Sequence, residues 1–197
     1  MNAVILNGGP GNGRGEVCRA VRDAASAEFQ SRGWSVRTFD LDGLTIKPCT
    51  GCFACWLKHP GICDVKDDAE EYVKAFVASD AVVWITPVTF GGASSALKKA
   101  LDRTIPSILP FFIKSHGEIH HPQRYTKRRR LLAFGTLLSA DPEAESIFRN
   151  LIRRNAVNFV PLATETGIVY ETEPPQAQAA RVADLIKAVG IGERRPQ

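Results

Sequence analysis

Strand-like and helix-like patterns of apolar residues alternate along the chain. Strands are predicted at residues 3–7, 34–41, 81–85 and 131–136, with further extended segments at 158–162 and 166–169. Helical spacing of apolar residues separates them at 16–32, from 69, after 92, from 142 and at 176–189. The segment 81–85 is almost wholly apolar, which is typical of a central parallel strand covered on both faces. This order of five βα units predicts a doubly wound α/β fold with a five-stranded parallel sheet.

Two of the predicted helices carry start signals. Asp141 is suited to cap a helix, and Pro142 is suited to its first turn. Asp67 and Asp68 precede the helix from 69, and two glutamates follow three residues later, as in a capping box. The predicted buried face of that helix consists of Ala69, Tyr72, Val73, Phe76 and Val77.

Length and composition favour one soluble globular domain. The chain has 197 residues, of which 44% are hydrophobic and 23% are charged, so we expect a single domain over 1–197. An irregular arm is expected at about 106–130, and a polar tail at 193–197. The net charge of +4 is too small to indicate nucleic-acid binding, and no apolar run approaches the ~20 residues of a membrane helix. The first residues lack the features of a signal peptide, so a cytoplasmic location is expected.

A glycine-rich loop follows the first predicted strand, where ligands of doubly wound sheets bind. Five of its eight positions from 8 to 15 are glycine, which lets backbone N–H groups approach an anion. The loop matches neither the dinucleotide fingerprint nor a Walker A motif, because Arg14 and Gly15 stand where the latter needs Lys and Ser or Thr. A phosphate site or a plain flexible turn both remain open. The candidate binding residues are Gly8, Gly9, Pro10, Gly13, Arg14 and Gly15.

Four of the five cysteines are grouped in the segment 42–66, which is predicted to be a loop with short turns. Cys49, Cys52, Cys55 and Cys63 have the spacing C-x2-C-x2-C-x7-C. Thiolates at such spacing suit a [4Fe–4S] cluster, and zinc, a reversible disulfide or no chemistry at all remain alternatives. Cys18 lies on the apolar face of a helix and is expected to be core.

A third loop, at 86–94, combines small residues with an aromatic side chain. Such a loop can lie along the edge of a flat ring and bond to it through backbone N–H groups. The candidate ring-binding residues are Pro87, Val88, Thr89, Phe90 and Gly91, with Thr136 expected to close the other edge. The alternative is an ordinary βα turn without a ligand, in which Ser94 or Ser95 caps the next helix.

These loops resemble those of the flavodoxin-like NAD(P)H-dependent FMN reductase family. The resemblance rests on the opening residues 4–10 and on residues 86–91, continued through Leu97-Lys98 to Asp102-Arg103. The cysteine loop, with Pro60-Gly61 and Asp67-Asp68, is similar to that of the branch that contains the iron–sulfur flavoproteins. The resemblance implies bound FMN, hydride transfer from NAD(P)H, and a homodimer or homotetramer in which the arm 106–130 contacts another subunit.

Three functions follow from these observations. The first is a flavin reductase that acts on a small-molecule or protein electron acceptor. The second is an electron carrier with FMN and a cluster on the four cysteines. The third is a flavin-free interaction protein, because Gly9, Gly11 and Glu16 stand where the family usually has Ser, Thr or Arg. In the first two functions the FMN phosphate would depend on backbone groups and Arg14.

Overall fold

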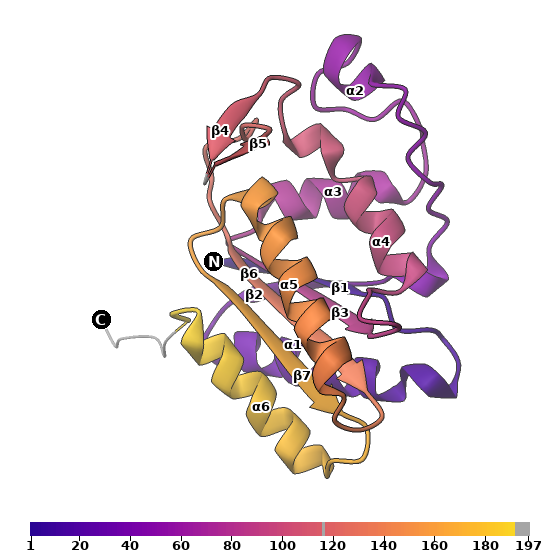
Figure 1. Cartoon of the computed structure of the whole chain (residues 1–197), viewed down its shortest axis with the longest axis vertical. Helices are drawn as coiled ribbons and strands as arrows, with labels where there is room; N and C mark the ends of the chain where they lie inside the picture. The colour runs from indigo at the N-terminus through magenta and orange to yellow at the C-terminus, as the bar shows by residue number, and fades with distance from the viewer. Residues whose placement is uncertain (116, 192–197) are drawn as a thin grey trace.

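Five parallel strands form the central sheet in the order β2-β1-β3-β6-β7 (Figure 1). The computed structural model describes residues 1–115 and 117–191, and of Arg14 the backbone alone. The predicted tail 193–197 lies outside the described residues. Counted along the chain, the parallel strands run 2-1-3-4-5, which confirms the flavodoxin-like doubly wound sheet. The strands are β1 (Asn2–Asn7), β2 (Ser35–Asp40), β3 (Ala81–Pro87), β6 (Arg130–Leu137) and β7 (Thr164–Tyr170).

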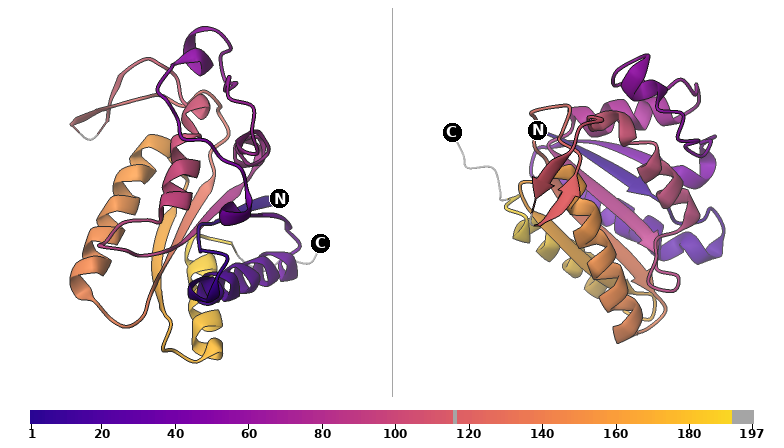
Figure 2. Two further views of the ribbon diagram at one scale, coloured as in Figure 1. Left: turned by 90° about the vertical axis from the view of Figure 1, so that its right-hand side faces the viewer. Right: turned by 45° about the horizontal axis from the view of Figure 1, so that its top comes forward.

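Helices cover both faces of this sheet (Figure 2). One face packs on α1 (Glu16–Ser31) and α6 (Pro175–Ala188). The other packs on α3 (Ala69–Ala78), α4 (Ser95–Asp102) and α5 (Pro142–Phe159). Val82 and Trp84 of β3 face the second group, whereas Val83 and Ile85 face the first. Both sides of the central strand are therefore buried, as the continuous apolar pattern predicts.

The helix starts agree with the sequence at α5 and depart from it at α3. The Asp141 carboxylate accepts a hydrogen bond from Ala144 N–H at 3.0 Å and caps α5. Before α3 the predicted capping box does not form, because Asp68 instead accepts from Thr45 N–H at 2.7 Å. The carboxylate of Asp67 accepts from Ala69 N–H at 3.0 Å, so this residue serves the helix start.

The buried face of α3 differs from the predicted one at three residues. Ala75 is buried, whereas Val73 and Val77 are half-buried. Val73 and Val77 still pack against the core, at the edges of the buried stripe, so the prediction overestimated their burial and missed Ala75.

Two other segments differ from what the sequence predicts. The arm 106–130 contains a 3-10 turn, η3 (Ile105–Ser107), and a two-stranded hairpin of β4 (Ile113–Ser115) and β5 (Glu118–His120). The segment 158–162 is not a strand, because α5 continues to Phe159 and ends where Val160 adopts a left-handed backbone. Non-local packing decides both segments, and their local patterns are too short to show it.

Short turns of helix complete the loops at the carboxyl edge and in the cysteine segment. They are η1 (Gly13–Gly15), η2 (Leu41–Gly43) and α2 (Ala54–Leu57). Within the described part of the chain, no helix is both long enough and apolar enough to cross a membrane.

Candidate functional site

The first and third predicted ligand loops are fastened to each other where β1 and β3 end. Gly8 N–H donates to the Ile85 carbonyl at 2.8 Å. The Ser94 hydroxyl donates to the Gly8 carbonyl at 2.7 Å and accepts from Leu97 N–H at 3.2 Å. Ser94 therefore caps α4 and joins the two loops at the same time. Both loops therefore meet at the switch in strand order, where ligands of doubly wound sheets bind.

Most polar groups of the first loop hold the loop itself. The Asn7 side-chain oxygen accepts from Gly9 N–H at 3.0 Å, and Gly15 N–H donates to the Asn12 carbonyl at 2.9 Å. Arg19 donates to the Pro10 carbonyl at 3.2 Å and lies within 3.5 Å of the two carbonyls that follow. These contacts fix the loop before any ligand binds. Sequence reasoning missed Asn7 and Arg19 because the loop contacts that they make are to backbone atoms.

The start of the helix leaves donors for an anion. Gly13 and Arg14 begin η1, so their N–H groups have no acceptor within that helix. No side chain caps the N-terminus of α1, and a Cβ at Gly13 would meet nothing closer than a Glu16 carboxylate oxygen at 4.0 Å. The side chain of Arg14 lies outside the described residues. An anion would therefore bind at Gly13 and Arg14, over the positive end of α1.

A carboxylate from another loop touches the same segment. Asp42, in η2, accepts from Gly11 N–H at 2.8 Å. Together with Glu16 it brings negative charge to the loop that is predicted to hold phosphate. No sequence pattern points to Asp42, which lies 31 residues further along the chain than Gly11.

The third loop is a tight turn at the end of β3. Thr89 and Gly92 exchange two backbone hydrogen bonds of 3.0 and 2.8 Å, and Phe90 and Gly91 between them have positive φ angles of 50° and 73°. Val88 N–H donates to the Thr136 carbonyl at 2.9 Å. These bonds leave the N–H groups of Phe90 and Gly91 at the tip. The Phe90 ring is 98% exposed, so the turn presents an aromatic face and backbone donors at the sheet edge.

Gly91 has no room for a side chain. A Cβ there would lie 2.4 Å from a methyl group of Ile147 on α5, and its φ of 73° disfavours any L side chain. We expect Gly91→Ala to lower the free energy of unfolding by about 1–3 kcal/mol. Urea denaturation of Gly91→Ala and of the double variant with Ile147→Ala measures this. The double variant should regain part of the loss, and equal stability of Gly91→Ala and wild type would contradict the packing described.

Thr136, which was expected to close the other edge of the ring site, has a buried side chain near the end of β6. Its hydroxyl oxygen is 3.4 Å from the Cys18 sulfur. Burial raises the pKa of the Cys18 thiol to about 11, although the contact with Thr136 opposes the shift. Cys18 is thus the core residue that the sequence predicts, and its thiol is inert at neutral pH.

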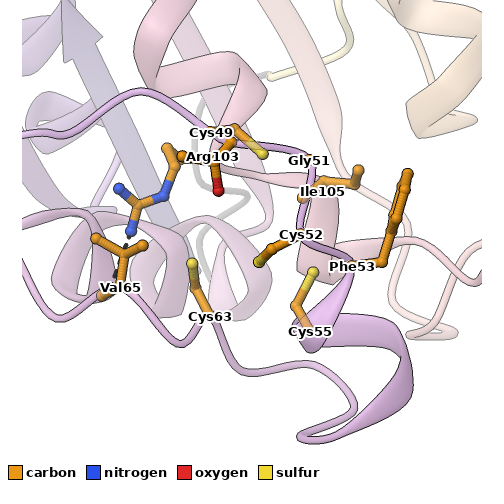
Figure 3. A pocket seen from close by; sticks show the side chains of 10 residues that line it. Cys49, Gly51, Cys52, Phe53, Cys55, Cys63, Val65, Arg103 and Ile105 are labelled. Carbon is orange, nitrogen blue, oxygen red and sulfur yellow. Dashed lines mark hydrogen bonds between the residues drawn. The ribbon is translucent and has the colours of Figure 1, made fainter.

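The four clustered cysteines line a single pocket (Figure 3). Cys49 and Cys52 are exposed, Cys63 is half-buried and Cys55 is buried. Their sulfur atoms face a common space in Figure 3. Burial raises the pKa of the Cys55 thiol to about 11, and the other three cysteines add to the shift. The other three thiols are therefore close enough to affect the pKa of Cys55.

Three residues with positive φ angles turn the cysteine loop around this pocket. Gly51, Phe53 and Gly61 have φ angles of 66°, 56° and 88°. Gly61 N–H donates to the Cys55 carbonyl at 2.9 Å, which returns the chain toward Cys63. Local conformation thus brings together four residues that are spread over fifteen positions.

Four cysteines that line one pocket supply the donor chemistry of a metal site or an iron–sulfur cluster. Among the described residues no group of three or more Cys, His, Asp or Glu side chains is arranged to hold a metal ion as it stands. A four-iron cluster is wider than one ion, because each thiolate binds a different iron. Four thiols around one space, beside a buried cation, fit that larger group in donor chemistry and in charge.

That cation is Arg103, which closes the base of the cysteine loop. It pairs with Asp67 through bonds of 2.7 and 3.0 Å, and both side chains are 2% exposed. It also donates to the carbonyls of Lys47 and Val65. Burial alone would raise the pKa of Asp67, but hydrogen bonds from Arg103, Lys47 N–H and Ala69 N–H hold that pKa below its usual range. The two ends of the loop are thereby joined.

The family of the chain follows from a match that covers both ligand loops and the cysteine loop. Residues 1–121 match the family model described as NADPH-dependent FMN reductase. The chain belongs to the NADPH-dependent FMN reductase family. An iron–sulfur flavoprotein from Methanocaldococcus jannaschii is 30% identical to this member over 115 residues, which are 58% of each chain. One from Archaeoglobus fulgidus is 33% identical over 99 residues, which are 50% of each. The chain thus spans about half the length of these curated relatives.

Solved structures of flavin-reductase type share the fold of this family member. An NAD(P)H:quinone oxidoreductase from Methanothermobacter marburgensis superposes with a TM-score of 0.70 at 14% identity, over 93% of this chain and 96% of the other. An FMN-dependent NADH-azoreductase from Bacillus anthracis, solved with FMN, gives 0.60 at 11% identity over 96% and 98%. At such identities these similarities show the fold.

Proposed function

We propose that the protein is an FMN-binding oxidoreductase that takes hydride from NAD(P)H. The observation that carries this proposal is the joint between the two ligand loops, in which Ser94 bonds to Gly8 where β1 and β3 end. A flavin needs an anion site and a flat ring site side by side, and this joint fixes one against the other. Membership in the FMN reductase family supports the choice of FMN.

Each end of the cofactor has its own partners in this proposal. The N–H groups of Gly13 and Arg14 and the N-terminus of α1 would hold the phosphate. The turn of residues 87–91 would hold the ring through its free backbone donors and the exposed Phe90. Bound FMN supplies the redox chemistry, by accepting hydride from a nicotinamide on its open face. The chain itself positions the ring and sets its electrostatic surroundings.

Asp42 is expected to weaken phosphate binding. Its carboxylate already accepts from Gly11 N–H, so its charge repels a phosphate dianion in the same loop. Asp42→Asn keeps an oxygen for Gly11 and removes the charge. We expect FMN to bind about three- to tenfold more tightly, by ~0.7–1.4 kcal/mol. Fluorescence titration of FMN measures the dissociation constant. Weaker binding by Asp42→Asn would show that the carboxylate supports the site.

Anaerobic reduction tests the oxidoreductase. Protein loaded with FMN is mixed with NADH or NADPH, and loss of the oxidised flavin absorbance is followed in time. Bound flavin should be reduced much faster than free FMN under the same conditions. Reduction at the rate of free FMN by both nucleotides would contradict the proposed donor while leaving FMN binding intact.

A second candidate function is electron transfer through a [4Fe–4S] cluster on Cys49, Cys52, Cys55 and Cys63. The shared pocket of the four thiols favours it. Curated relatives that match this chain are named iron–sulfur flavoproteins. The helix α4 links the two proposed sites, with Ser94 before its start and Arg103 after its end. This helix is eight residues long, or roughly 12 Å, so one short element connects the two regions.

Anaerobic reconstitution with iron and sulfide tests this candidate. We expect a broad brown absorbance band and about four iron atoms bound per chain. A variant with Cys52 and Cys55 changed to Ser should bind neither iron nor sulfide. The matched control is Cys18→Ser, which alters a cysteine outside the pocket. Iron bound equally by all three proteins would overturn the assignment of ligands.

A further inference from the structure

One N–H group of Arg103 is buried without a partner. The side chain is 2% exposed, and its Nε atom has no hydrogen-bond partner among the residues that the structure describes. A guanidinium has five N–H donors. The two Nη atoms make four hydrogen bonds, two to Asp67 and one each to the carbonyls of Lys47 and Val65. The Nε donor alone is left over.

This donor borders the cysteine pocket. Arg103 lines the pocket together with all four cysteines, and Figure 3 shows its guanidinium beside Cys63 at the edge of the common space. A buried donor without an acceptor costs about 1–3 kcal/mol, so a bound group that supplies an acceptor here would be stabilised by it. The groups that face it across the pocket are thiols, which accept strongly only as thiolates.

We propose that Arg103 donates a hydrogen bond from Nε to a sulfur of a [4Fe–4S] cluster held by the four cysteines, and thereby raises the reduction potential of that cluster. Asp67 positions the guanidinium by occupying both Nη atoms. This inference rests on the second candidate function.

Charge explains the direction of the effect. One electron added to a four-iron cluster with four thiolate ligands changes the total charge from 2− to 3−, so a nearby cation stabilises the reduced form more. Hydrogen bonds to the sulfurs act in the same direction. Asp67 offsets part of the guanidinium charge, but its carboxylate bonds to Nη atoms on the far side from the free Nε donor.

The test compares cluster potentials in reconstituted protein. Redox titration with dithionite, read by EPR of the reduced cluster, gives the midpoint potential. Arg103→Lys keeps the positive charge and removes Nε–H. We expect the equilibrium constant for reduction to fall about tenfold, which is 59 mV for one electron. The control is Lys98→Gln, which removes an exposed charge from α4, the helix that ends just before Arg103. It should leave the potential unchanged. Equal potentials in wild type and Arg103→Lys overturn the proposal.

A second measurement needs no variant. Wild-type protein grown with arginine labelled with ¹⁵N at Nε is reconstituted, and the reduced cluster is examined by pulsed EPR. A resolved ¹⁵N coupling is expected, and its absence overturns the hydrogen bond. If the wild type assembles no cluster, this inference and the electron-transfer function both fail. FMN binding, measured on the same sample, then still decides the first proposed function.

Discussion

Replacement of Gly13 by aspartate is expected to weaken FMN binding by about tenfold to a hundredfold, or ~1.4–2.8 kcal/mol. Gly13 begins the turn whose N–H groups face the predicted phosphate site, and a Cβ there meets nothing closer than 4.0 Å. The added carboxylate therefore fits the fold but repels a phosphate dianion at short range. Fluorescence titration of FMN gives the change in dissociation constant.

The matched control is Gly13→Ala, which adds the same Cβ without charge. It should bind FMN nearly as well as wild type, and both variants should unfold at the wild-type temperature. If Gly13→Asp and Gly13→Ala bind FMN with identical affinity, the FMN phosphate does not bind at this loop.

Asp67→Ala is expected to lower the free energy of unfolding by about 3–5 kcal/mol. The carboxylate bonds to Arg103 at 2.7 and 3.0 Å and accepts from Lys47 N–H at 2.9 Å and Ala69 N–H at 3.0 Å. Alanine leaves the guanidinium charge buried and unpaired, which costs far more than the loss of a surface ion pair. Urea denaturation followed by circular dichroism measures the change.

Asp102 provides the comparison for that effect. Its pair with Lys98, at 2.6 Å, is exposed to solvent, so Asp102→Ala should change stability by less than about 1 kcal/mol. If Asp67→Ala loses as little stability as Asp102→Ala, the Arg103–Asp67 ion pair contributes little to the free energy of unfolding.

The sequence predicts the sheet and its helices because their signals are local. A continuous apolar run marks β3 as buried on both faces, and Asp141 marks the start of α5. The hairpin of β4 and β5 and the end of α5 were not predicted. Their strands are three residues long, and α5 stops at a residue, Val160, whose type gives no sign of a left-handed backbone.

The candidate site was likewise predicted only in part. Glycine content and cysteine spacing identify its loops, since both reflect residue type. The contacts that shape these loops join residues far apart in the chain: Asp42 with Gly11, Ser94 with Gly8, and Arg103 with Asp67. Each pair is polar, and a polar residue in a loop carries no pattern that reveals its partner. Arg103 ends a stretch that the resemblance identified, yet its burial is visible only in the structure.

Equilibrium dialysis of the wild-type chain against FMN tests the central claim most directly. If the joined loops at the ends of β1 and β3 form a flavin site, the protein should retain FMN at about one molecule per chain and turn yellow. Excess inorganic phosphate should compete only weakly, because the ring contributes much of the affinity. A protein that stays colourless at FMN concentrations well above those that saturate ordinary flavoproteins would contradict the account.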